Sequence, residues 1–82
     1  MFYDDAKGAM VRGEQVWFNP YLRTKISTGG LIEYLTTTEY ASGERNRTAL
    51  VVHFINDNPT LDQIPLDLLY ATREECEAAI NK

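Results

Sequence analysis

The sequence predicts a small, mainly β domain with one short C-terminal α-helix. Runs of β-branched and aromatic residues recur along residues 13–55, and glycine, asparagine or proline bounds each run. A helix-start pattern stands at Thr72, close to the C-terminus. At 82 residues the chain suits one domain, and its modest size leaves little stability to spare.

The first three strands are expected over residues 13–18, 31–40 and 48–55. In the second strand, Ile32 and Tyr34 share one side while Glu33 lies on the other, which predicts that Ile32 and Tyr34 face inward. Leu31 and Leu35 break this alternation. We therefore expect a β-bulge or a sharp bend within this strand.

The third strand is apolar on both sides. One row is Leu50, Val52 and Phe54, and the other is Ala49, Val51, His53 and Ile55. A strand of this kind is usually central or covered, and the C-terminal helix or residues 1–12 can supply the cover. A partner protein or a second copy can do so instead, because exposed apolar patches mark interaction sites. The candidate association strand is therefore Val51, His53 and Ile55.

The last third of the chain predicts a turn, a loop, a short strand and a helix. Residues 56–59 form the turn, residues 61–63 a connecting loop, and residues 66–70 a last short strand. Thr72 and Glu75 have the spacing of a capping box. Cys76, Ala79 and Ile80 then form a narrow apolar stripe, so this short helix must dock on the sheet to be stable.

Residues 1–12 give the weakest signal and are expected to be a flexible N-terminal arm, with residues 13–82 as the single domain. In the alternative, Phe2 and Tyr3 pin the arm across the domain or onto a second subunit.

Charge and cysteine content exclude some classes of function. The net charge is −4, and residues 51–82 carry all of this excess, which argues against non-specific binding to nucleic-acid phosphates. Cys76 is the single cysteine, so no internal disulfide forms, as in a cytoplasmic protein. Residues 1–10 lack the apolar core of a signal peptide, and no apolar run is long enough to cross a membrane.

The sequence offers no pattern typical of catalysis. His53 and Cys76 are too few to form a zinc site, and both fall among apolar residues. Gly29 and Gly30 precede a strand and lack the lysine of a phosphate-binding loop. We therefore expect no enzyme activity, no cofactor and no metal.

Two stretches carry a resemblance to a known class. The first is Gly13-Glu14-Gln15-Val16-Trp17-Phe18, and the second runs from Ile64-Pro65 through Leu69-Tyr70 into Thr72-Arg73-Glu74-Glu75-Cys76-Glu77-Ala78-Ala79. Over residues 13–80 the chain resembles small uncharacterised bacteriophage and prophage proteins with an SH3-like barrel. The resemblance implies a barrel of about five antiparallel strands in a bacterial cytoplasm. It implies no activity, because a fold does not fix a function.

Two binding functions follow. The first is a non-enzymatic module that acts by protein–protein contact, as a phage accessory or inhibitor protein or by self-association. The alternative is a nucleic-acid module that uses aromatic and arginine residues of the loops. The candidate binding surface comprises Trp17, Tyr21, Arg23, Tyr34, Tyr40, Arg45 and Arg47.

Overall fold

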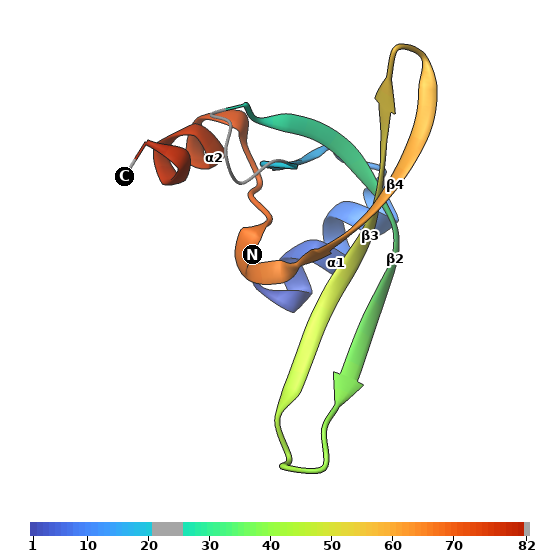
Figure 1. Cartoon of the computed structure of the whole chain (residues 1–82), viewed down its shortest axis with the longest axis vertical. Helices are drawn as coiled ribbons and strands as arrows, with labels where there is room; N and C mark the ends of the chain where they lie inside the picture. The colour runs from blue at the N-terminus through green and yellow to red at the C-terminus, as the bar shows by residue number, and fades with distance from the viewer. Residues whose placement is uncertain (21–25, 82) are drawn as a thin grey trace.

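The computed structural model describes residues 1–20 and 26–81, which form an α+β fold (Figure 1). Its elements are α1 (Tyr3–Arg12), β1 (Val16–Phe18), β2 (Thr28–Glu39), β3 (Arg45–Ile55), β4 (Asn58–Pro65), the 3-10 helix η1 (Leu66–Leu68) and α2 (Arg73–Ile80). The four strands pair antiparallel in chain order, β1-β2-β3-β4. The tips of the β2–β3 and β3–β4 hairpins point to opposite ends of the molecule (Figure 1).

The sheet is open, and this corrects the predicted five-stranded barrel. Residues 66–70, predicted as the closing strand, form η1 and one isolated bridge between Trp17 and Tyr70. The backbone tightens into a 3-10 turn directly after Pro65, so only the end of the segment is extended enough to pair. One bridge is not a ladder, and in the described part of the chain β1 and β4 remain the edges of the sheet.

β4 replaces the predicted loop at residues 61–63. Asn56 and Asp57 both have positive φ, 51° and 67°, which fits the two-residue turn whose twist matches that of paired strands. Pairing therefore resumes at once, with Ile55 opposite Asn58. Pro59 is tolerated because β4 is an edge strand, where a missing backbone donor breaks no second ladder.

Residues 3–12 form helix α1 in place of the predicted flexible arm. Gly13 ends the helix in the left-handed conformation, with φ 66°. The Gly13 amide donates to the Met10 carbonyl oxygen, and the Glu14 amide donates to the Ala9 carbonyl oxygen. Ala6 and Ala9 are buried against the sheet. α1 packs against β2, and its buried alanines belong to the same apolar core as Ala49 and Val51 of the third strand.

The core lies between α1, the inner side of the sheet and the segment around η1. Its buried apolar residues are Ala6, Ala9, Val16, Phe18, Ile32, Ala49, Val51, Leu66 and Leu69. The alanines of α1 have short side chains, so the helix axis lies close to the strands. Gly30 has the same effect within the sheet, because an added Cβ would lie 2.6 Å from a Val51 methyl and 2.7 Å from the Val52 carbonyl oxygen.

The C-terminal helix agrees with the prediction. The Thr72 hydroxyl accepts a hydrogen bond from the Glu75 amide at 3.2 Å, which is the hydroxyl half of the predicted capping box. Cys76 is fully buried, and Ala79 and Ile80 are half-buried beside it. The helix docks near β1, where the Arg73 guanidinium lies 4.6 Å from the centre of the Trp17 ring.

Candidate functional site

The sheet has one covered side and one open side. α1 and η1 cover the side that carries Ala49, Val51 and His53. Leu50, Val52 and Phe54 of β3 point the opposite way and are half-buried or exposed. Cross-strand pairing places Leu31 and Leu61 beside Val52, and Tyr34 beside Leu50. We call Leu31, Tyr34, Leu50, Val52, Phe54 and Leu61 the open face.

The row of β3 that is accessible to a partner is not the row predicted from the sequence. Val51 and His53 of the predicted association strand are 0% and 2% exposed, because Val51 belongs to the apolar core and the Phe18 ring of β1 packs against His53. Ile55, at the end of the strand, is exposed. Phe54 from the other row is 67% exposed. The surface that a partner can reach is therefore the row that contains Leu50, Val52 and Phe54.

A β-bulge decides which residues of β2 join this surface. The register shifts between Ile32 and Tyr34, which confirms the predicted irregularity. Ile32 faces the core as predicted, whereas Tyr34 turns to the open side and is about half exposed. Because Glu33 is an extra residue in β2, the alternation of sides shifts by one after it. Leu35 therefore points to the inner side, where it packs against the core. The prediction that Tyr34 faces inward is therefore wrong.

His53 is buried in a polar contact on the covered side. Its Nε2 lies 2.6 Å from the Asp62 carboxylate on β4, and its ring meets Phe18 edge-on at 5.2 Å. The Nδ1 atom is buried and makes no hydrogen bond within the described chain. This contact joins β3 to β4, and the Asp62 carboxylate points to the covered side of the sheet, away from the open face.

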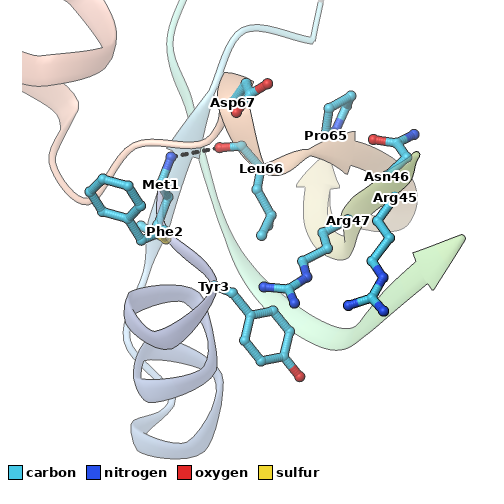
Figure 2. A pocket seen from close by; sticks show the side chains of 9 residues that line it. All are labelled: Met1, Phe2, Tyr3, Arg45, Asn46, Arg47, Pro65, Leu66 and Asp67. Atoms are coloured by element: carbon cyan, nitrogen blue, oxygen red, sulfur yellow. Dashed lines mark hydrogen bonds between the residues drawn. The ribbon is translucent and has the colours of Figure 1, made fainter. Parts of the chain in front are cut away.

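A second surface is a pocket of about 300 Å³ beside the N-terminal end of β3 (Figure 2). It is lined by Met1, Phe2, Tyr3, Arg45, Asn46, Arg47, Pro65, Leu66 and Asp67, and we call it the arginine pocket. The Arg47 guanidinium lies 4.5 Å from the centre of the Tyr3 ring. The Met1 amino group donates to the Leu66 carbonyl oxygen at 2.7 Å, which holds the start of α1 against η1 (Figure 2).

The structure separates the residues predicted to form one aromatic and arginine surface. Trp17 lies near α2, Tyr34 on the open face, Tyr40 beside the tip of the β2–β3 hairpin, and Arg45 and Arg47 in the arginine pocket. Tyr21 and Arg23 fall outside the described residues. A continuous strip for stacking nucleotides is not assembled from the five that are described.

Sequence reasoning missed Leu31, Leu61 and Tyr3 as surface residues. For Leu61 the missing signal is the two-residue turn at Asn56 and Asp57, because a strand that resumes directly after it places Leu61 opposite Val52. For Tyr3 the available signal was the start of α1, with Asp4 and Asp5 in its first turn.

Side-chain chemistry in the described residues is limited. No group of three or more His, Cys, Asp or Glu side chains comes together there in a way that could hold a metal ion. Burial, followed by the nearby Glu77 carboxylate, raises the pKa of the Cys76 thiol, so the nucleophilic thiolate is disfavoured. None of the helices in the described ranges has the length and apolar character needed to cross a membrane.

Comparison of the chain with protein-family models, with curated proteins and with solved structures finds no match.

Proposed function

We propose that this protein is a non-enzymatic binding module that acts by protein–protein contact, and that its open face pairs with a second copy of the chain. The observation that carries this proposal is the exposure of Phe54 and Leu61, 67% and 58%, beside the half-buried Leu50 and Val52. Large apolar side chains gathered on one side of a sheet favour burial against another surface.

The composition of the open face favours a second copy as its occupant. All six of its residues are uncharged, and the nearby Asp62 carboxylate is turned inward toward His53. Glu33 borders the face beside Leu31, Val52 and Phe54, so two such faces approach with like charge at this border and none among their six defining residues. Homodimer interfaces are more apolar than other interfaces, and two sheets pack face to face about 10 Å apart.

The size of the face sets the expected strength of the contact. Its four most exposed side chains present on the order of 400 Å² of apolar surface, a typical value for the largest patch on a small monomer. Two faces together bury on the order of 800 Å², which is smaller than a standard specific interface and suits a weak, transient contact. We therefore expect a reversible dimer with a dissociation constant in the micromolar range.

The relation to small bacteriophage-type proteins with an SH3-like barrel is part of this proposal, as is a cytoplasmic location. The antiparallel strand order β1-β2-β3-β4, the 3-10 turn after β4 and the Trp17–Tyr70 bridge support it through chain order alone, since the sheet itself is open. In such a context the module would act as an accessory or inhibitor protein.

The test is the mass of the protein in solution by sedimentation equilibrium, from about 1 µM to about 500 µM. The wild-type chain is expected to shift from monomer to dimer over this range. Phe54→Glu and Leu61→Glu place a charge in the interface and are expected to remain monomeric. Val11→Glu is the matched control, because Val11 is 75% exposed on the outer side of α1 and should leave dimerisation unchanged.

Two results would overturn the proposed dimer. One is a wild-type chain that stays monomeric at the highest concentration. The other is a dimer that Phe54→Glu and Leu61→Glu leave intact. Circular dichroism of each variant shows whether the fold is retained, which is expected because the substituted side chains are exposed.

A further inference from the structure

The β3 edge is incompletely paired next to the arginine pocket. β4 accompanies β3 only as far as Pro65, which lies opposite Thr48. The chain then turns into η1, while β3 extends three residues further, to Arg45. In the described chain, these three residues pair with β2 on one side and have no strand on the other.

Hydrogen-bond alternation shows which backbone groups face this free edge. The hairpin closes with the Tyr40 amide bonded to the Glu44 carbonyl oxygen at 2.9 Å, so the backbone of Glu44 points toward β2. Orientation alternates along an antiparallel strand. The N–H and C=O groups of Arg45 and Arg47 therefore point away from β2 and toward the pocket.

The side chains at the same positions supply positive charge. Arg45 and Arg47 project from one side of β3 and line the same pocket, and Figure 2 shows the Asp67 carboxylate directed away from both guanidinium groups. Tyr3 contacts Arg47 through its ring face, which leaves the N–H edges of the guanidinium free to donate. No ion pair joins Arg47 to a carboxylate in the described residues. Arg45 makes a long, exposed contact with Glu39, at 3.7 Å, as its one ion pair among the described residues.

We propose that the arginine pocket binds an extended acidic peptide segment, which adds a short strand to β3 and places alternate carboxylates on Arg45 and Arg47. The backbone edge and the arginines repeat at the same two-residue interval, so one extended chain can satisfy both. A planar guanidinium binds a carboxylate through two parallel N–H donors. A nucleic-acid strand fits less well, because its sugar–phosphate backbone has no N–H groups to pair with the free edge.

This site is independent of the proposed dimer. Arg47 lies on the covered side of the sheet, in register with Thr37, whereas Phe54 lies on the open side. A dimer formed through the open faces would leave two arginine pockets accessible, one on each copy.

The test is fluorescence anisotropy of a labelled peptide in which Thr and Glu alternate over about eight residues, with the full chain as titrant. The matched peptide has Gln in place of every Glu and is expected to bind at least about tenfold more weakly. Arg45→Gln and Arg47→Gln are each expected to weaken binding of the acidic peptide at least about fivefold. Arg73→Gln is the control, because Arg73 also contacts an aromatic ring but lies beside Trp17.

Several results would overturn this site. The acidic peptide could fail to bind, or the glutamine peptide could bind equally well. Arg73→Gln could lose as much peptide affinity as Arg47→Gln, or an oligothymidylate of matched charge could bind more tightly than the peptide. If Arg47→Gln fails to fold, the exposed Arg45→Gln still decides the question. Phe54→Glu should bind the peptide with wild-type affinity, so failure of the dimer and failure of the peptide site are distinguishable.

Discussion

Gly30 is a residue of β2 at which an added side chain would collide with β3. An alanine methyl there would lie 2.6 Å from the Val51 side chain and 2.7 Å from the Val52 carbonyl oxygen, so the two strands must move apart. Gly30→Ala is expected to lower the free energy of unfolding by about 2 kcal/mol, as overpacking of a core does. Urea denaturation followed by circular dichroism measures the change.

At Gly8, substitution by alanine is expected to have the opposite effect on stability. The three side-chain atoms nearest to an alanine methyl at Gly8 all belong to the Arg12 guanidinium, an exposed and flexible group that can move away. Gly8→Ala is therefore expected to raise the free energy of unfolding by about 0.5–1 kcal/mol, because glycine is a poor residue in a helix interior. A loss of stability in Gly8→Ala would contradict the expectation that the Arg12 guanidinium moves away, and an unchanged stability in Gly30→Ala would contradict the packing described at Gly30.

The contact between His53 and Asp62 is expected to stabilise the fold. Asp62→Ala removes the partner of a buried ring nitrogen, on a ring whose other nitrogen already lacks one. The expected loss is about 1–3 kcal/mol, because a buried polar group without a partner keeps its desolvation cost. Asp62→Asn retains a side-chain oxygen and should lose less.

Thermal unfolding measures both Asp62 variants, and Glu44→Ala serves as the control on an exposed carboxylate. A change of 1 kcal/mol corresponds to about 4–8 °C in a domain of this size. Equal melting temperatures for Asp62→Ala and Glu44→Ala would show that the contact contributes little to stability.

At the scale of the element, α2 depends on its cap and on docking. It has eight residues, too few for an isolated helix to be stable, and Cys76 is its fully buried residue. Undocking of α2 exposes the thiol, whose pKa is raised by burial in the folded state, so labelling by a thiol reagent reports the opening.

Thr72→Ala is expected to accelerate this labelling about fivefold. The substitution removes the hydrogen bond to the Glu75 amide, and loss of an N-cap costs about 1 kcal/mol. Thr38→Ala on exposed β2 is the control and should label at the wild-type rate. Equal rates for all three proteins would mean that labelling does not require α2 to leave the sheet.

The contrast between α2 and α1 shows what the sequence could predict at this scale. The helix at α2 was predictable because Thr72 and Glu75 form a local signal and Cys76, Ala79 and Ile80 form an apolar stripe. The inward stripe of α1 includes two alanines, Ala6 and Ala9, which add little to an apolar pattern, and Gly8 interrupts it. Tertiary packing, which local propensity does not contain, stabilises α1.

The open face was more predictable from the sequence than the arginine pocket, because the pocket depends on tertiary contacts. The apolar rows of β3 could be read from alternation alone, but which row is covered depends on α1. The arginine pocket joins Tyr3 to Arg47 across more than forty positions of sequence, and no local pattern indicates that contact. Arg45 and Arg47 were therefore identifiable as candidates, while their aromatic partner was not.

At the scale of the whole molecule, salt should separate the two proposed interactions. The open face is uncharged, whereas the arginine pocket acts through charge in a chain of net charge −4. Raising NaCl from about 0.1 M to about 1 M shortens the Debye length from roughly 10 Å to roughly 3 Å. Binding of the acidic peptide is expected to weaken several-fold over this range, because its carboxylates and the arginines are solvent-accessible.

Dimerisation is expected to respond in the opposite direction. Screening reduces the repulsion between two acidic chains, and a salt such as sodium sulfate also strengthens the burial of apolar surface. Sedimentation equilibrium and peptide anisotropy, measured in the same buffers, should therefore give dissociation constants that move apart as salt increases. If both constants rise together, one charged surface mediates both interactions, and the assignment of self-association to the apolar face of the sheet is wrong.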